Sequence, residues 1–243
     1  MLIMPRRPPP GRCIHCLKQF DQLTWDHVLP DSWYPELADN HEKWQAPSCE
    51  FCNNELGKLE ENLLTKFGLC LDPLDKNSQG IPEKVIRSLN PEVGRNERDK
   101  EFRQKRRKKT QNETRVLEEP PSQNIFPNFG PLPNVIYQEY PTIEINPEDL
   151  EKFARKVVRG IAYIADKSFI EDNYEIEIFF LENDKAEGMK KFVDTNSEVF
   201  DRKPGLLAKR RLVENDPVGG IYYIEIWYRF IFFAVVAPKD LNL

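Results

Sequence analysis

The sequence has no long uninterrupted apolar run. Its most apolar stretch, Ile221 to Ala237, contains Glu225 and Arg229 and is shorter than the ~20 residues that cross a bilayer. The N-terminal residues carry two arginines and a run of prolines where a secretory signal needs an apolar core. No internal repeat is visible. We therefore expect no contact with membranes and a cytoplasmic location.

The sequence also lacks a surplus of positive charge. It has 35 Lys and Arg against 40 Asp and Glu, a net charge of −5, and this balance alone argues against nucleic acid as a partner because phosphate contacts come from Lys and Arg. The local distribution differs, since Arg98 to Lys109 contains eight basic and two acidic residues, a local charge of +6. Such a run is either a solvated linker or a surface for phosphates. Its closeness to the candidate site described below favours the second interpretation.

The composition is that of a globular protein with polar connecting chain. Of the 243 residues, 40% are hydrophobic and 31% charged, and the chain is long enough for two small domains. We predict an α+β protein in three parts. Residues 1–71 bear Cys, His and Trp, residues 72–133 form a charged, Pro-rich and extended connection, and residues 134–243 form a C-terminal α+β domain. Within the connection, helices are expected at Pro82 to Leu89 and from about Pro91 to Val116.

The C-terminal part has a clear helix signal after a strand candidate at Thr142 to Ile145. Asn146 is a suitable cap, Pro147 suits the first helical position, and acidic residues follow. An apolar face then recurs at helical spacing; its members are Leu150, Phe153, Val157, Ile161 and Ile164. Strands are expected at Tyr174 to Leu181 and, as one or two segments, at Ile221 to Val236.

Aromatic residues in this last segment occupy both odd- and even-numbered positions. Because alternate residues of a strand point to opposite faces, a strand there presents aromatics on both faces. One face is expected to pack on the helix, and the other must meet a second sheet, a partner protein or another copy of the chain. The C-terminal part contains no recognisable catalytic set. We therefore expect it to serve recognition, assembly or control through a protein partner or a homo-oligomer.

The cysteines form the most specific pattern. Cys13-x-x-Cys16 and Cys49-x-x-Cys52 are two knuckles separated by thirty-two residues, and two such pairs in a cytosolic chain predict one structural zinc ion held by four thiolates. The alternatives are two unrelated pairs or a redox dithiol. Cys70 is expected to be a small core residue. His15, inside the first knuckle, is expected to be a loop residue, with metal ligation as the alternative.

The segment between the knuckles is longer than in a zinc ribbon and contains Asp26 and His27. A carboxylate beside an imidazole can supply a hard metal ligand and a general base for phosphodiester hydrolysis. An isolated Asp-His pair is more often a hydrogen-bonded pair in the core or at the surface. The flanking cysteines, and Asn53 at the predicted start of a helix, favour the catalytic interpretation.

The order of these elements resembles zinc-containing HNH endonucleases. The match is carried by Asp26-His27-Val28-Leu29-Pro30 and by Cys49-x-x-Cys52-Asn53, and it covers Arg12 to Leu64. The resemblance implies a ββα-metal domain in which Asp26 and Asn53 bind one catalytic Mg²⁺ or Mn²⁺ ion and His27 is the general base. Asn54 is an alternative to Asn53 as the ligand.

The resemblance further implies DNA as the substrate, with RNA not excluded, and a bacterial defence effector whose cleavage a partner controls. Phosphate contacts are predicted at six basic residues, namely Lys58, Lys105, Arg106, Arg107, Lys108 and Lys109.

One position departs from the family. Many relatives have an asparagine five residues before the third zinc cysteine, where it orients the base; here that position is Trp44, with Asn40 and His41 nearby. The middle residue of the signature is therefore unassigned. This departure leaves a second hypothesis open, a zinc-stapled module that binds nucleic acid without cleaving it.

Overall fold

The computed structural model describes residues 6–36, 43–119, 139–180 and 183–240. Short strands β1 (Gly11–Arg12) and β2 (Gln19–Phe20) pair with each other and carry the first knuckle between them. Strands β3 (Thr24–His27) and β4 (Gln45–Ser48) pair antiparallel, and helix α1 (Glu50–Cys70) follows β4 directly. The chain thus has a ββα order here, with Cys49 as the N-cap residue of α1.

The connecting region contains two helices, as its sequence predicted. Helix α2 (Ile81–Leu89) starts close to the expected position, and helix α3 (Glu97–Glu113) carries the basic run. Thr110 is the one buried residue of α3, so this helix has no apolar face to bury. Its contacts to α1 and α2 are made by charged side chains. Short 3-10 turns lie at Asp31–Trp33, Lys76–Ser78 and Pro91–Val93. The Pro-rich part predicted to be extended lies largely outside the described residues.

Strand β5 (Thr114–Leu117) pairs with β6 (Tyr140–Ile143), which begins two residues before the predicted strand. Helix α4 (Pro147–Asp166) begins as expected, because the Asn146 side chain accepts a hydrogen bond from the backbone N–H of Glu148 at 3.0 Å. The predicted apolar positions of α4 from Leu150 to Ile161 are buried, and Ile164 packs on the same core while partly exposed.

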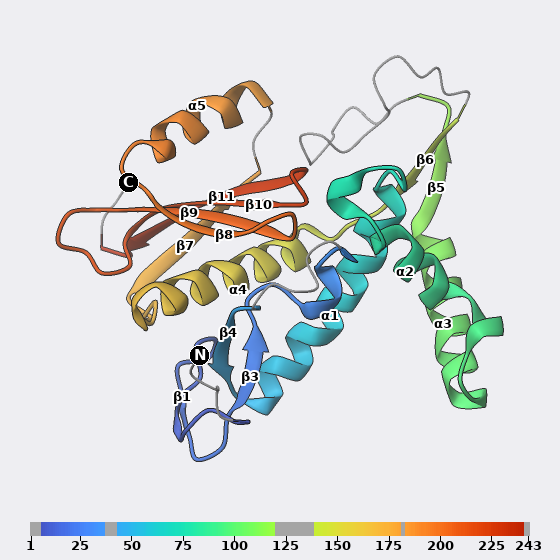
Figure 1. The fold of residues 1–243 in the computed structure, drawn as a ribbon, viewed down its shortest axis with the longest axis horizontal. Coiled ribbons are helices and arrows are strands. Elements are labelled where there is room, and N and C mark those ends of the chain that lie inside the picture. Colours follow the sequence, from blue (N-terminus) through green and yellow to red (C-terminus); the bar gives the residue numbers. More distant parts are fainter. Residues whose placement is uncertain (1–5, 37–42, 120–138, 181–182, 241–243) are drawn as a thin grey trace.

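The C-terminal sheet has five antiparallel strands in the order β7-β11-β10-β9-β8. Figure 1 shows α4 on one side of this sheet and α5 on the other, with β3, β4 and α1 on the far side of α4. The remaining bounds are β7 (Tyr174–Phe179), α5 (Asn183–Asp194), β8 (Glu198–Arg202), β9 (Leu206–Leu212), β10 (Gly220–Ile226) and β11 (Phe230–Pro238).

Both faces of the central strands are covered by the chain itself. Tyr222 and Phe232 belong to the main core, whereas Tyr223 and Phe233 pack with Val193 of α5 in a second cluster. The alternation follows from the two-residue repeat of a strand. The expectation that the second face needs another sheet or another molecule is therefore wrong, because α5, which the sequence pattern did not predict, lies on it.

One hydrophobic core contains residues of the first and third parts of the sequence. The Trp33 ring stacks on Phe153 of α4 and on Trp227, with centroids 4.6 Å and 5.3 Å apart, and the indole N–H of Trp227 donates to the carbonyl of Trp33 at 2.7 Å. The three-part division of the chain stays a prediction. The shared core explains how a side chain of α4 can reach the residues of β3.

Candidate metal centre and adjoining carboxylate cluster

The four knuckle cysteines come together as predicted. We call Cys13, Cys16, Cys49 and Cys52 the cysteine cluster; their sulfur atoms all lie within 4.8 Å of one another. The first two come from the turn between β1 and β2 and the others from the first turn of α1. None of the five cysteines is in a disulfide.

The geometry of the cysteine cluster suits a tetrahedral metal ion. Zn–S bonds of about 2.3 Å place the sulfur atoms roughly 3.8 Å apart, and the Sγ atoms of Cys16 and Cys49 are 3.9 Å apart. Backbone N–H groups of His15 and Cys52 donate to the sulfurs of Cys13 and Cys49, both at 3.4 Å, and such donors stabilise thiolates. These residues fit a zinc ion. Cys70 has an exposed position at the end of α1, so its prediction as a core residue is wrong.

A second polar cluster adjoins the first and was not predicted. We call His15, Asp26, Glu60 and Lys156 the carboxylate cluster. The Lys156 ammonium of α4 is 2.9 Å from Asp26 Oδ1 and forms an ion pair with Glu60 of α1, while Nε2 of His15 is 2.9 Å from Asp26 Oδ2. His15 is thus a partner of Asp26 and not merely a loop residue.

Burial makes the contacts of the carboxylate cluster strong. The side chains of Lys156 and Asp26 are 2% and 6% exposed. Burial by itself raises the pKa of Asp26, but the hydrogen bond from His15 and the charge of Lys156 outweigh it, so the pKa lies below its ordinary value. For Glu60, burial wins over the charge of Lys156 and raises the pKa to about 7.

Asp26 and His27 do not share a pocket. Adjacent side chains of a strand point to opposite faces, and Asp26 faces α1 and α4 whereas His27 Nε2 lies 2.9 Å from the side-chain amide of Gln45. Gln45 is the cross-strand partner of His27. Gln45 follows Trp44, the residue at the middle position of the family motif. The residue beside the predicted base is therefore Gln45. Asn40 and His41 lie outside the described residues.

His27 is suited to accept a proton. Its pKa is lowered because partial burial disfavours the charged imidazolium, and this outweighs the carboxylates of Asp31 and Asp26, which raise the pKa. A lowered pKa keeps the ring neutral near pH 7. Which ring nitrogen carries the proton depends on whether the amide oxygen or the amide nitrogen of Gln45 faces it.

Asn53 is held against β3, and Asn54 is exposed. The Asn53 side-chain amide donates to Thr24 Oγ1 at 2.9 Å and to the carbonyl of Trp25 at 3.5 Å. Thr24 and Asp26 are two residues apart and share a face of β3, so Asn53 and Asp26 lie on the same side of the strand.

Asp26 and Asn53 do not form an open cation site in this arrangement. Both carboxylate oxygens of Asp26 already have partners, and the Lys156 ammonium occupies a contact position that a divalent ion would need. The predicted Mg²⁺ or Mn²⁺ ion therefore does not fit beside Asp26 while Lys156 stays in place.

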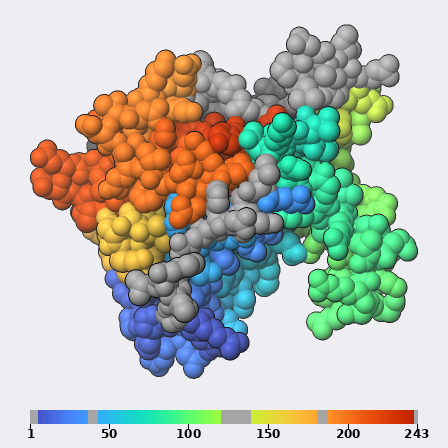
Figure 2. Space-filling view, viewed as in Figure 1, coloured from blue at the N-terminus to red at the C-terminus, as the bar shows by residue number. Residues whose placement is uncertain are grey.

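The predicted phosphate contacts divide into two groups. Arg106 pairs with Glu61, Lys109 donates to Asn62 at 3.0 Å and Lys58 pairs with Glu55 at 2.5 Å. The others, Lys105, Arg107 and Lys108, are exposed. Figure 2 shows α3 projecting from the body of the molecule.

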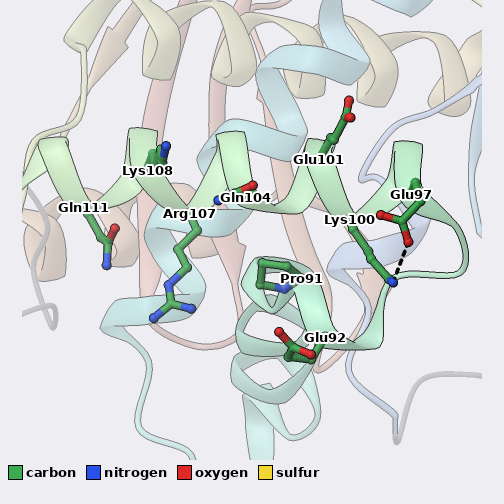
Figure 3. A pocket seen from close by; sticks show the side chains of 9 residues that line it. All are labelled: Pro91, Glu92, Glu97, Lys100, Glu101, Gln104, Arg107, Lys108 and Gln111. Carbon is green, nitrogen blue, oxygen red and sulfur yellow. Dashed lines mark hydrogen bonds and ion pairs between the residues drawn. The ribbon is translucent and has the colours of Figure 1, made fainter.

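A hollow of about 560 Å³ lies between α3 and the 3-10 turn at Pro91–Val93 (Figure 3). Three basic and three acidic side chains line it, namely Lys100, Arg107, Lys108, Glu92, Glu97 and Glu101. Lys100 is already paired with Glu97 at 2.7 Å. The formal charges of these six side chains sum to zero, so the hollow as a whole carries no positive charge.

Comparisons with protein-family models, with curated proteins and with solved structures found no match. The likeness to HNH endonucleases therefore depends on the motif residues alone. Among the described residues, no helix has both the length and the apolar character needed to cross a membrane. The cytoplasmic location stays a prediction.

Proposed function

We propose that the protein is a metal-dependent endonuclease of the HNH type that hydrolyses phosphodiester bonds, with DNA as the favoured substrate and RNA not excluded. The observation that carries the proposal is the ββα order of β3, β4 and α1, with the cysteine cluster joining its base. Within that unit, His27 and Asn53 occupy the strand and the helix start where the HNH motif has its base and its last ligand. The zinc ion would hold this frame and take no part in chemistry, because four thiolates leave it no open position.

In this proposal His27 takes a proton from the attacking water. The Gln45 amide nitrogen lies 2.9 Å from Nε2 of His27; with the amide turned over, its oxygen would accept the Nε2 proton and leave Nδ1 free to act as the base. Gln45 would then position the ring, the role that an asparagine has in the family motif. The lowered pKa of His27 supports this assignment because the ring is in its basic form at neutral pH.

Nucleic acid would be held by the exposed cations of α3. Lys105, Arg107 and Lys108 are the members of the basic run best placed for phosphates, since Arg106 and Lys109 already contact α1. Charge contacts of this kind make binding strongly dependent on salt.

A specific observation favours a second candidate, a zinc-stapled module that binds nucleic acid without cleaving it. Asp26, the predicted metal ligand, is buried and paired with Lys156. The two candidates differ in whether this pair ever opens. A partner protein that controls cleavage, as in a defence effector, remains part of the first proposal.

The experiment that tests the proposal is plasmid cleavage in Mg²⁺ or Mn²⁺ by the wild type and by His27→Ala. Loss of a general base should slow cleavage by about 10²–10⁴-fold, with zinc content and thermal stability nearly unchanged. Asn53→Ala and its exposed neighbour Asn54→Ala form a matched pair in which the first alone should impair cleavage. Salt-dependent binding without cleavage in any divalent ion would favour the binding module instead.

A further inference from the structure

Helix α3 has its one large apolar side chain on the outside. Phe102 is 56% exposed, whereas the buried residue of this helix is Thr110. A phenylalanine ring usually contributes to the docking of a helix through its burial, but α3 is docked on α1 through the polar ends of Arg106 and Lys109. Because single exposed apolar residues are common on protein surfaces, the surroundings of the ring decide what it can do.

The side chains that share a helix face with Phe102 are cations. The guanidinium of Arg98, four residues earlier, lies 5.8 Å from the ring centroid. Lys105 follows three residues after Phe102, a spacing that places it on the same face, and both cations are exposed. An exposed aromatic ring thus lies between two exposed positive charges.

These positive charges are not neutralised by the acidic residues at the start of α3. Among the described residues, neither Arg98 nor Lys105 forms an ion pair, because the nearby carboxylates have other neighbours. These neighbours are Lys100 for Glu97, at 2.7 Å, Arg103 for Asp99, at 3.2 Å, and the hollow of Figure 3 for Glu101. The face of α3 around Phe102 is therefore positively charged and complementary to a polyphosphate.

We propose that Arg98, Phe102 and Lys105 form a binding surface for single-stranded nucleic acid, in which one base stacks on the Phe102 ring and the neighbouring phosphates contact the two cations. We call these three residues the stacking surface. With the guanidinium of Arg98 on one side of the ring, the base would stack on the other side. The inference deepens the proposed function and rests on its nucleic-acid substrate, of which it names the form.

The aromatic ring is what makes this surface selective for single strands. In a duplex the faces of each base are covered by the bases above and below, whereas bases of a single strand can be splayed out and stacked on an aromatic side chain. Such stacking is tolerant of sequence because every base has a π face. The exposed cations Arg107 and Lys108, in contrast, would contact the phosphates of a duplex and of a single strand alike. Phe102 is thus the residue that distinguishes the two forms.

The test is binding of fluorescein-labelled oligonucleotides by the full-length protein, measured by fluorescence anisotropy without added Mg²⁺ or Mn²⁺. The probes are a ~16-nucleotide single-stranded DNA of mixed sequence, its duplex, and RNA of the same sequence. Wild type should bind both single strands more tightly than the duplex. Phe102→Leu should weaken single-strand binding by about 5- to 150-fold and leave duplex binding nearly unchanged.

Leucine keeps an apolar side chain and favours a helix more than phenylalanine does, so a loss in Phe102→Leu reports the aromatic ring and not the fold, which circular dichroism checks. Phe102→Trp should keep single-strand binding. The matched control is Phe192→Leu on α5, where an exposed ring also has a guanidinium beside it, that of Arg211 at 4.1 Å, but lies outside the basic run. This control should bind every probe as wild type does.

The dependence of binding on salt separates stacking from charge. Lys105→Gln removes one phosphate contact and should reduce the slope of log affinity against log salt concentration by about 0.7 for a single strand. Phe102→Leu should leave this slope unchanged, because stacking releases no counterion. The loss in Phe102→Leu should be equal for DNA and RNA, since stacking does not involve the 2′-hydroxyl.

Three outcomes would overturn the proposal. The first is single-strand binding by Phe102→Leu that is as tight as that of the wild type. The second is an equal loss of single-strand and duplex binding in this variant, which would make Phe102 a wedge between the base steps of a duplex. The third is the absence of single-strand binding by the wild type.

Plasmid cleavage by the wild type separates this proposal from the proposed function. Single-strand binding that depends on Phe102, without cleavage in Mg²⁺ or Mn²⁺, would keep the stacking surface and reject the nuclease. Cleavage that is lost in His27→Ala, together with unchanged single-strand binding in Phe102→Leu, would keep the nuclease and reject the stacking surface.

Discussion

The cysteine cluster and the carboxylate cluster lie side by side, joined through His15, and differ in where their positive charge comes from. The four sulfurs of the first have no ammonium or guanidinium hydrogen-bonded to them among the described contacts, and their spacing fits a metal ion. In the second, Lys156 supplies a cation from within the chain. The first cluster could thus hold an external metal ion, whereas the second already contains a cation that the chain itself supplies.

Removing a zinc ligand should have the largest effect. Cys49→Ser takes away one of four thiolates, while the serine hydroxyl can still cap α1, and structural zinc contributes about 10–16 kcal/mol of apparent binding free energy in small zinc domains. We expect loss of zinc and unfolding of the N-terminal part, measured by metal analysis and circular dichroism. Cys70→Ser, at the exposed cysteine, is the control and should change neither. If zinc-free protein were as stable as the wild type, the cysteine cluster would not hold a structural zinc ion.

Breaking the carboxylate cluster should cost less, but still much. Asp26→Asn removes one of the two carboxylates that face Lys156 and leaves Glu60 as its partner, so the loss should stay below the ~3–5 kcal/mol of a buried charge left wholly unpaired. The adjacent His27→Ala should cost far less because His27 is partly exposed and contacts Gln45. Urea unfolding measures the loss in free energy of unfolding for each of the two variants. Equal losses for the two would mean that Asp26 is not held by a buried ion pair.

Part of this arrangement could be predicted from the sequence, because some signals are local. Two CxxC pairs imply a common ion whatever lies between them, and Asn146 with Pro147 marks the start of α4 by cap chemistry alone. Lys156 had a local signal too, since it occupies the apolar face of α4 between Phe153 and Val157. Its partners could not be predicted, because Asp26 lies 130 residues earlier in the chain and only the shared core brings the two together.

Other features were missed for similar reasons. Helix α5 has few apolar residues and a glycine, so its pattern is weak, yet it covers the second face of the sheet. The Asp26-His27 pair was assigned to one centre from adjacency in sequence, but strand alternation directs the two side chains to opposite faces. The residue beside His27, Gln45, depends on the register of β3 and β4, which the long segment between them does not determine.

The third prediction tests how closely α4 must approach the carboxylate cluster. In Gly160→Ala, the new methyl group would clash with Val28, and overpacking costs about 1–3 kcal/mol, more than the gain of up to ~1 kcal/mol in helix propensity. Gly57→Ala in α1 has nothing within 4 Å of the new Cβ and should be stabilising. Thermal unfolding should show a lower unfolding temperature for Gly160→Ala and a higher one for Gly57→Ala. A stabilised Gly160→Ala protein would show that α4 has room to move against β3 without strain.

The smallest effect is expected at Arg159, three residues after Lys156 on the same face of α4. Its guanidinium donates to the carbonyls of Ile14 and Ile170 at 3.4 Å and 3.2 Å and interacts electrostatically with Cys13 and Cys52. Helix α4 thus brings one cation directly into the carboxylate cluster and a second one only near the cysteine cluster.

Arg159→Gln keeps a hydrogen-bond donor but removes that second charge. Since four thiolates and one Zn²⁺ carry a net charge of −2, the nearby Arg159 cation should stabilise the zinc complex through its charge alone, because its guanidinium donates to carbonyls and not to a sulfur. We expect zinc to bind about tenfold more weakly, or ~1.4 kcal/mol, in competition with a chromophoric chelator. Arg155→Gln, which loses a partly exposed ion pair with Glu151, is the control and should leave zinc affinity unchanged. If the two variants bind zinc equally well, the charge on α4 matters only to the carboxylate cluster, and the two clusters are electrostatically independent despite their contact through His15.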